Sequence, residues 1–234
     1  MTTTLITGAN KGLGFETARR LIAAGHTVYA AARDPERGRR AAALGARPLV
    51  LDVTDDASVA AAVRTVAADG GLDVLVNNAG IEQRGEDNSV TGADGTTADL
   101  LRTVFETNVF GLVRVTHAFL PLLRRSTAPV VVNVSSGLAS LTGLSAPESP
   151  GYGYPGLAYP ASKTAVNALT VQYAKAFPGM RINAVEPGFT ATDLNGNTGT
   201  QTVAEGAEVI VRLAQPGPDG PTGGYFDAQG PLPW

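Results

Sequence analysis

The chain has 234 residues, of which 44% are hydrophobic and 17% charged, and its formal net charge is −3. This length suits one well-packed α/β domain, and no basic cluster favours nucleic-acid binding. The chain has no cysteine, which excludes disulfides, thiolate metal ligands and cysteine nucleophiles. Its two histidines, His26 and His117, lie in no metal-ligand pattern, so no metal site is expected.

Short apolar runs alternate with helical patterns along nearly the whole chain. The predicted strands are Thr4–Thr7, Thr27–Ala31, Pro48–Leu51, Val74–Asn77, Val130–Val134, Arg181–Val185 and, more weakly, Gly224–Asp227. The predicted helices are Leu13–Ala24, Pro35–Leu44, Asp56–Ala68, Ala98–Arg124, Ala158–Phe177 and Val203–Leu213. Most strands are rich in Val, Leu and Ile without polar alternation, as expected for strands covered on both faces. The pattern predicts a single α/β domain over residues 1–234, with a Rossmann-type, doubly wound parallel sheet of about seven strands and helices on both faces.

The first strand begins by Thr4, which leaves no room for a signal peptide ahead of it. The apolar stretches are too short or too interrupted to span a bilayer. We therefore expect a cytoplasmic protein that does not engage a membrane.

Two segments interrupt the alternation of strands and helices. Residues 82–97 are polar and read as a surface loop ahead of the long helix. Residues 141–157 contain three prolines and four glycines together with Tyr152 and Tyr154. Because open α/β sheets bind ligands in the loops at the carboxyl ends of their strands, this second loop is a candidate substrate wall. The alternative is a Pro/Gly surface connection that does not contact substrate.

A glycine-rich turn, Thr7–Gly14, joins the first strand to the first helix. Its three glycines allow positive φ and close approach of a pyrophosphate, while the helix N-terminus supplies free N–H groups; these glycines are Gly8, Gly12 and Gly14, with Asn10, Lys11 and Leu13 among them. The spacing differs from GxGxxG, and such a turn can also be an ordinary helix entry. Its position after the first strand of a βαβ unit favours phosphate binding.

The end of the second strand bears on the choice of nicotinamide cofactor. Asp34 precedes Pro35 and is best explained as an N-cap with proline at the first helical position. Arg33 is then left to bind a 2′-phosphate, with Lys11 as a second cation. This arrangement favours NADP(H) over NAD(H), although two solvated surface cations remain the alternative.

Tyr159 and Lys163 lie one helical turn apart, and the pair Ser135-Ser136 precedes them. A tyrosine hydroxyl has a pKa of about 10, and a nearby cation lowers it by favouring the phenolate. The spacing predicts Tyr159 as a proton donor to a carbonyl oxygen, with Lys163 beside it and a serine hydroxyl binding the same oxygen. The alternative is a chance pair on an exposed helix.

Asn108 lies in a strongly apolar helical stretch, where a polar side chain must find a partner. It is either bonded to nearby backbone or part of the predicted site.

These residues resemble the short-chain dehydrogenase/reductase family over nearly the whole chain. The resemblance rests on TGANKGLG, the Asn77–Gly80 segment NNAG, Asn108, Ser136, the YPASK segment at Tyr159–Lys163, and Pro187-Gly188. Ser136 matches the family serine better than Ser135 does. The NKGLG and Ala-Arg-Asp patterns and the enlarged stretch between serine and tyrosine look most like the carbonyl reductase branch, which uses NADPH.

The resemblance implies further roles. Asn108 would hold a water linked to Lys163, and Lys163 would also contact the nicotinamide ribose. Asp52 and Val53 would flank the adenine, and Asn78, Ala79 and Gly80 would line the ribose side. The nicotinamide carboxamide would be held by the segment after the sixth strand, at Pro187, Gly188, Phe189, Thr190 and Thr192.

The sequence thus predicts an NADP(H)-dependent oxidoreductase that interconverts a carbonyl group and an alcohol on a small-molecule substrate. A non-catalytic NADP(H)-binding sensor and a nucleotide-sugar epimerase-type enzyme are the alternatives. Tyr152, Tyr154, Leu157 and Phe189 hint at an apolar or aromatic carbonyl compound. The expected assembly is a monomer or homodimer.

Overall fold

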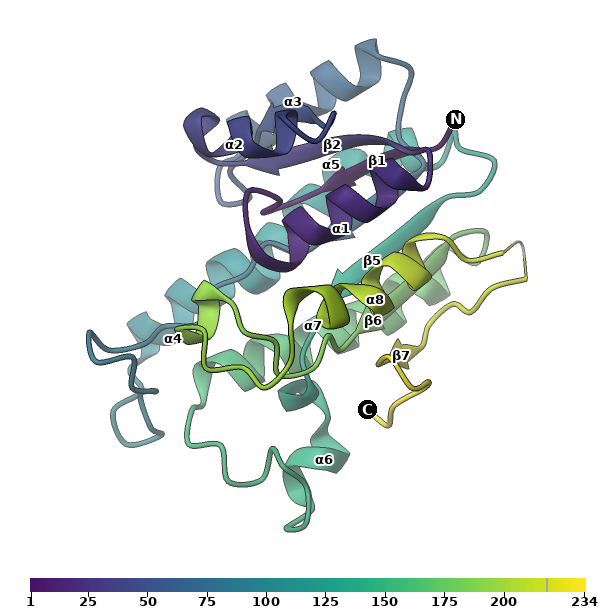
Figure 1. Cartoon of the computed structure of the whole chain (residues 1–234). Helices are drawn as coiled ribbons and strands as arrows, with labels where there is room; N and C mark the ends of the chain where they lie inside the picture. The colour runs from purple at the N-terminus through teal and green to yellow at the C-terminus, as the bar shows by residue number, and fades with distance from the viewer. Residues whose placement is uncertain (218) are drawn as a thin grey trace.

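The computed structural model describes residues 1–217 and 219–234. For Arg37 and Arg39, it describes the backbone and not the side chain. It contains a seven-stranded sheet in the order β3-β2-β1-β4-β5-β6-β7, with every neighbouring pair parallel (Figure 1). The strands are β1 Thr3–Ile6, β2 Thr27–Ala32, β3 Arg47–Val50, β4 Val74–Asn77, β5 Val130–Val134, β6 Arg181–Val185 and β7 Tyr225–Phe226. The predicted fold class, a doubly wound Rossmann-type domain, is confirmed.

The longer helices lie close to their predicted ranges. They are α1 Gly12–Ala23, α2 Pro35–Ala42, α3 Asp56–Ala68, α4 Ala98–Phe105, α5 Gly111–Leu123, α7 Ala158–Ala176 and α8 Val203–Ala214. The side chain of Asp34 accepts the N–H of Glu36, which agrees with its predicted role as the cap of α2.

Successive strand residues point to opposite faces of the sheet, and each face has its own core. One row of register partners crosses the sheet from Tyr29 through Leu5, Leu75 and Val131 to Ile182, and it packs with α3, α5 and α7. The neighbouring row, which includes Ile6, Val76 and Val132, packs with α1 and α8. In Figure 1, α1 and α8 cross in front of the strands. Since β1 lies between β2 and β4, the chain changes direction across the sheet at β1 and β4, which is where such folds bind ligands.

The helix predicted over Ala98–Arg124 is divided. A π-helical turn, Glu106–Phe110, separates α4 from α5, and the N–H of Gly111 donates to the carbonyl of Glu106 five residues earlier. A β-carbon at Gly111 would lie 2.8 Å from Cγ2 of Val53, so glycine lets this helix approach the turn after β3. The sequence did not indicate this break, because the apolar spacing runs through it.

Three other differences from the sequence prediction concern loops and the last strand. Residues 141–157 begin with a short helix, α6 Leu141–Ser145, preceded by a 3₁₀ turn at Gly137–Ala139. A second 3₁₀ turn, Asp193–Asn195, follows β6. β7 is shorter than predicted. Within the described residues, none of the helices has the length and apolar character needed to cross a membrane.

Candidate active site

The turns after β1 and β4 are joined where the chain changes direction across the sheet. The hydroxyl of Thr7 accepts the N–H groups of Asn78 and Ala79, both at 3.0 Å. The side-chain amide of Asn78 donates to the carbonyls of Thr7 at 2.8 Å and Gly8 at 3.2 Å. These contacts hold the glycine turn against the NNAG segment.

The glycine turn has the geometry of an anion cradle. Gly8 and Gly12 have φ values of +65° and +54°, which side chains rarely adopt. A β-carbon at Gly14 would lie 2.5 Å from Nδ2 of Asn78 and 2.8 Å from the carbonyl oxygen of Gly8. Lys11, the N-cap of α1, makes no capping hydrogen bond through its side chain. The first N–H groups of α1 therefore have no side-chain cap, which fits a bound phosphate.

The two predicted cations differ in their surroundings. Arg33 is exposed after β2, and its charge acts on Asp52. Burial opposes ionisation of Asp52, but hydrogen bonds from Thr54 and the charges of Arg33 and Arg114 hold its pKa below the ordinary value. Lys11 instead forms an ion pair with Asp193 at 2.6 Å. The structure thus places a carboxylate beside Lys11 that the sequence analysis did not anticipate.

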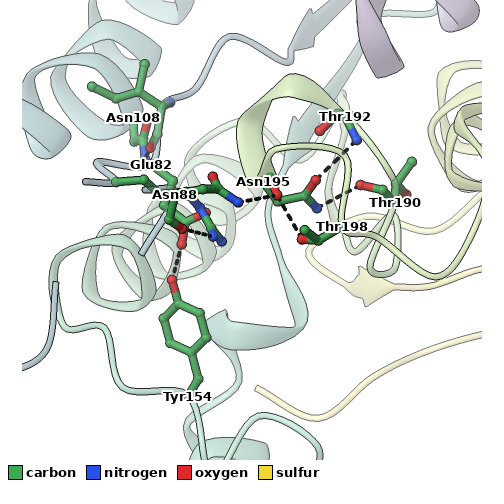
Figure 2. Close-up of polar contacts among 10 residues, drawn as sticks. Glu82, Asn88, Asn108, Tyr154, Thr190, Thr192, Asn195 and Thr198 are labelled. Carbon is green, nitrogen blue, oxygen red and sulfur yellow. Dashed lines mark hydrogen bonds and ion pairs between the residues drawn. The ribbon is translucent and has the colours of Figure 1, made fainter. Parts of the chain in front are cut away.

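The Pro187-Gly188 turn after β6 is held by a neighbouring segment. Gly188 has a φ of +80°, and the side-chain amide of Gln201 packs against it and donates to the carbonyl of Pro187. The same amide donates to the hydroxyl of Thr190 at 2.9 Å. The backbone after the turn is further tied by Asn195, which donates to the carbonyl of Thr190 and accepts the N–H of Thr192. Figure 2 shows these contacts of Asn195.

Tyr159 and Lys163 come from the first turns of α7. The Nζ of Lys163 lies 5.6 Å from the centre of the Tyr159 ring and donates to the carbonyl of Val134 at 2.8 Å. The hydroxyl of Ser136, just after β5, lies close enough to the Tyr159 phenol to act on its pKa. Ser135 is buried, and its hydroxyl donates to Asn167 at 2.6 Å. Of the two serines, Ser136 therefore meets the tyrosine.

The pKa values of this pair are set mainly by burial. Protein atoms around the phenol raise the pKa of Tyr159 above its ordinary value, and the negative charge of Glu82 adds to this. The nearby hydroxyl of Ser136 acts in the opposite direction and lowers this pKa. Burial also lowers the pKa of Lys163 to about 8. The expected lowering of the Tyr159 pKa by Lys163 is thus not found, because burial raises this pKa and Lys163 is not among the groups that shift it.

Asn108 lies buried in the π-helical turn. Its amide donates to the carbonyl of Ile81 at 2.9 Å and to the hydroxyl of Ser162 at 3.0 Å, and its oxygen accepts the N–H of Ile81. A β-carbon at Gly80 would lie 3.4 Å from Oδ1 of Asn108 and 3.5 Å from Nζ of Lys163. Asn108 thus ties the helix to the end of the NNAG segment, close to Lys163.

A small pocket, open to solvent, lies beside Tyr159. Its other walls come from the loop after β4, from Leu100 of α4, and from Tyr154 and Leu157. Residues 82–97 are therefore not only a surface loop, because their first residues face this pocket. Tyr152 and Phe189, also considered for the substrate side, are exposed and do not line it.

Most of the predicted site residues lie at the carboxyl ends of the strands, in the loops and in the helices that follow them. The residues not yet placed are Asn10 in the glycine turn, Leu13 in the first turn of α1, and Val53 beside Gly111. Tyr154 and Leu157 of the predicted substrate loop do line the pocket. Glu82, Asn195, Gln201 and Glu186 were not predicted. Glu186 immediately precedes the Pro187-Gly188 turn, and its carboxylate accepts the N–H of Gly188 at 2.9 Å. Its position before that turn was the one signal that could have found it.

Known proteins of one family match this sequence and this structure. The family model described as short chain dehydrogenase matches residues 2–203. The (+)-neomenthol dehydrogenase of Capsicum annuum is 31% identical in an alignment that covers 95% of this chain and 94% of that protein. The chain therefore belongs to the short-chain dehydrogenase/reductase family. As a member, it is an oxidoreductase of a family that binds nicotinamide cofactors.

Two solved structures of reductases superpose closely on this chain. Salutaridine reductase from Papaver somniferum superposes with a TM-score of 0.84 and 28% identity, covering 97% of this chain and 99% of that one. The NADPH-bound carbonyl reductase from chicken fatty liver superposes with a TM-score of 0.87 and 28% identity, covering 100% and 99%. The resemblance to carbonyl reductases is thus confirmed.

Proposed function

We propose that the protein interconverts a carbonyl group and an alcohol with NADP(H), and that Tyr159 is its acid/base. The observation that carries this proposal is the meeting of Tyr159 with the Ser136 hydroxyl at the wall of a pocket, with Lys163 buried beside them. A proton donor and a second hydrogen-bond donor then converge where a carbonyl oxygen would gain charge.

The glycine turn fits the pyrophosphate of a nicotinamide cofactor, through the positive φ values of Gly8 and Gly12 and the N-terminus of α1. Arg33 would hold the 2′-phosphate, and Lys11 would contribute once it leaves Asp193. Asp52 and Val53 would lie at the adenine, and Asn78, Ala79 and Gly80 at the ribose. The Pro187–Thr192 segment would hold the carboxamide. When bound, the nicotinamide supplies or accepts the hydride.

In the reductive direction, Tyr159 donates its proton to the carbonyl oxygen, and Ser136 donates a hydrogen bond to the same atom. The raised pKa of Tyr159 keeps the phenol protonated at neutral pH, which supports reduction. Lys163, with a pKa of about 8, is mostly charged at neutral pH and stabilises the tyrosinate left behind. Asn108 would hold a water that passes protons to Lys163 from solvent.

Residues 141–157 would form the substrate wall through Tyr154 and Leu157, both of which line the pocket. The apolar share of this lining favours an apolar or aromatic carbonyl compound.

The test is the loss of NADPH absorbance with a panel of ketones, aldehydes and quinones, each repeated with NADH. Turnover of at least one class with NADPH, and weaker turnover with NADH, is expected. Tight NADPH binding without turnover of any class would favour the non-catalytic sensor. Equal use of both cofactors would contradict the role of Arg33.

A further inference from the structure

A continuous series of polar contacts joins the substrate pocket to the backbone of the proposed cofactor site (Figure 2). The hydroxyl of Tyr154 donates to Oε1 of Glu82, which lines the same pocket. The other carboxylate oxygen of Glu82 pairs with Arg84 at 2.9 Å. Arg84 in turn donates to the carbonyl of Asn88 at 3.1 Å.

The first part of this series is buried. The side chains of Glu82 and Arg84 are only 6% and 15% exposed. A buried carboxylate needs its partners, because leaving it unpaired is costly. Burial, followed by the hydrogen bond to Glu82, raises the pKa of Tyr154, so its hydroxyl keeps the proton that it donates. The turn formed by residues 82–88 is thus fixed to the pocket wall.

The second part crosses to the segment after β6. The side-chain amide of Asn88 donates to the carbonyl of Asn195 at 3.2 Å. Asn88 has a φ of 64°, and Gly196 opposite it has a φ of 63°. A β-carbon at Gly196 would collide with the amide of Asn88. Both residues therefore have backbone conformations that suit this close contact, which joins positions 107 apart in sequence.

The third part lies inside the cofactor loop, which we define as residues 189–201. Asn195 is buried, and its side chain donates to the carbonyl of Thr190 and accepts the N–H of Thr192. Thr190 and Thr192 are the residues proposed to hold the nicotinamide carboxamide. The contact from Asn88 therefore reaches the residue that orients both of them, without itself touching the cofactor site.

We propose that Asn88 is a positioning residue that transmits the ordering of the cofactor loop to the substrate pocket. Cofactor bound at Thr190 and Thr192 fixes Asn195, and Asn195 fixes Asn88. The turn formed by residues 82–88 then holds Tyr154 at the wall beside Tyr159. The substrate pocket takes its final shape only after the cofactor is in place. This inference rests on the proposed function, since it needs a nicotinamide cofactor at the loop.

The test is amide hydrogen exchange with and without NADP⁺, which requires no knowledge of the substrate. The N–H groups of Gly85, Asn88 and Tyr154 are hydrogen bonded within their own turns and report the order of those turns. In the parent protein, NADP⁺ should slow exchange in residues 189–201 and also in 82–91 and 150–157. The loss of one hydrogen bond corresponds to an effect of about two- to tenfold.

The variant Asn88→Gly removes the amide and keeps a residue that suits positive φ. It should retain NADP⁺-dependent slowing in residues 189–201 and lose it in both distant segments. Tyr154→Phe should lose it in 150–157 alone. Glu86→Gly, at an exposed position of the same turn, controls for added chain flexibility and should behave as the parent does.

Slowing confined to residues 189–201 in the parent would overturn the inference and leave the proposed function standing. The same holds if Asn88→Gly and Tyr154→Phe both transmit the effect normally. If NADP⁺ slowed exchange nowhere, including at the glycine turn, the proposed function and the inference would fail together.

Discussion

The ammonium of Lys163 is buried beside the ring of Tyr159, with the carbonyl of Val134 as its hydrogen-bond acceptor at 2.8 Å. Within the described part of the chain, no ion pair is recorded for this group. A buried ammonium without a counter-ion destabilises the folded chain, which is why the pKa of Lys163 falls to about 8. The buried charge of Lys163 thus lowers the free energy of unfolding of the protein.

Replacing this charge should stabilise the protein. A fall of the pKa from 10.5 to about 8 corresponds to about 3 kcal/mol. The variant also loses the hydrogen bond from Lys163 to the carbonyl of Val134, which lowers its stability by about 1 kcal/mol. Lys163→Met should therefore raise the free energy of unfolding at pH 7 by about 2 kcal/mol in urea titrations, while turnover is lost.

The same variant has a pH signature. Between pH 8 and 10.5 the unfolded chain binds this proton and the folded chain has released it, so parent stability rises with pH across that window. The difference in stability between Lys163→Met and the parent should shrink as the pH rises through it. A difference that is constant with pH would show that Lys163 is not a depressed-pKa group.

Turnover should depend on the hydroxyl of Tyr159. Tyr159→Phe keeps the ring and removes the proton donor, so turnover should fall by about 10²-fold or more. NADPH affinity should change little. Tyr152→Phe is the matched control, because Tyr152 is an exposed tyrosine that does not line the pocket. Near-normal turnover by Tyr159→Phe would rule out the proposed acid/base.

Cofactor preference should depend on Arg33. A charge-assisted contact to the 2′-phosphate is worth about 1.5–3 kcal/mol, so Arg33→Ala should weaken NADPH binding by about 10- to 150-fold. NADH binding should be almost unchanged. Asp193→Asn removes the partner of Lys11 and should strengthen NADPH binding by about two- to fivefold at low salt. If binding titrations showed that Arg33→Ala weakens the affinity for NADPH and NADH equally, the role of Arg33 at the 2′-phosphate would be contradicted.

The glycine turn should not tolerate a side chain at Gly14. Alanine is the better helix former by about 1 kcal/mol, but its β-carbon would crowd Asn78 and the carbonyl of Gly8. Gly14→Ala should cost about 1–3 kcal/mol of stability through overpacking and should weaken NADPH binding. Gly179→Ala is the control, since a β-carbon there meets nothing within 4 Å. Equal stability of the two variants in denaturant titrations would contradict the crowding.

Local signals predicted much of the fold, because they depend on neighbours along the chain. The cap at Asp34, the buried strands and the residues of the glycine turn all have short-range patterns. The contacts between Tyr154 and Glu82, 72 positions apart, and between Asn88 and Asn195 have no such pattern. They depend on how three loops meet in space, which spacing within any one loop does not determine.

The pKa of Tyr159 likewise depends on contacts between segments that are far apart in sequence. A lysine one turn away in sequence predicts a lowered value, whereas packing and Glu82 raise it. The charge of Glu82 acts on Tyr159 because both residues line the same pocket, although they are far apart in sequence.

The π-helical turn at Glu106–Phe110 makes the number of residues in this helix matter as well as their identity. Deleting one residue there would let α4 continue into α5 as one α-helix with little change in their relative orientation, because the π-helical turn absorbs one extra residue. The deletion would instead remove the wider turn that holds the Asn108 amide against Ile81 and Ser162. The extra residue in this helix is therefore what positions Asn108, and a change in the helix length would disturb Asn108 before it disturbed the packing of α4 and α5.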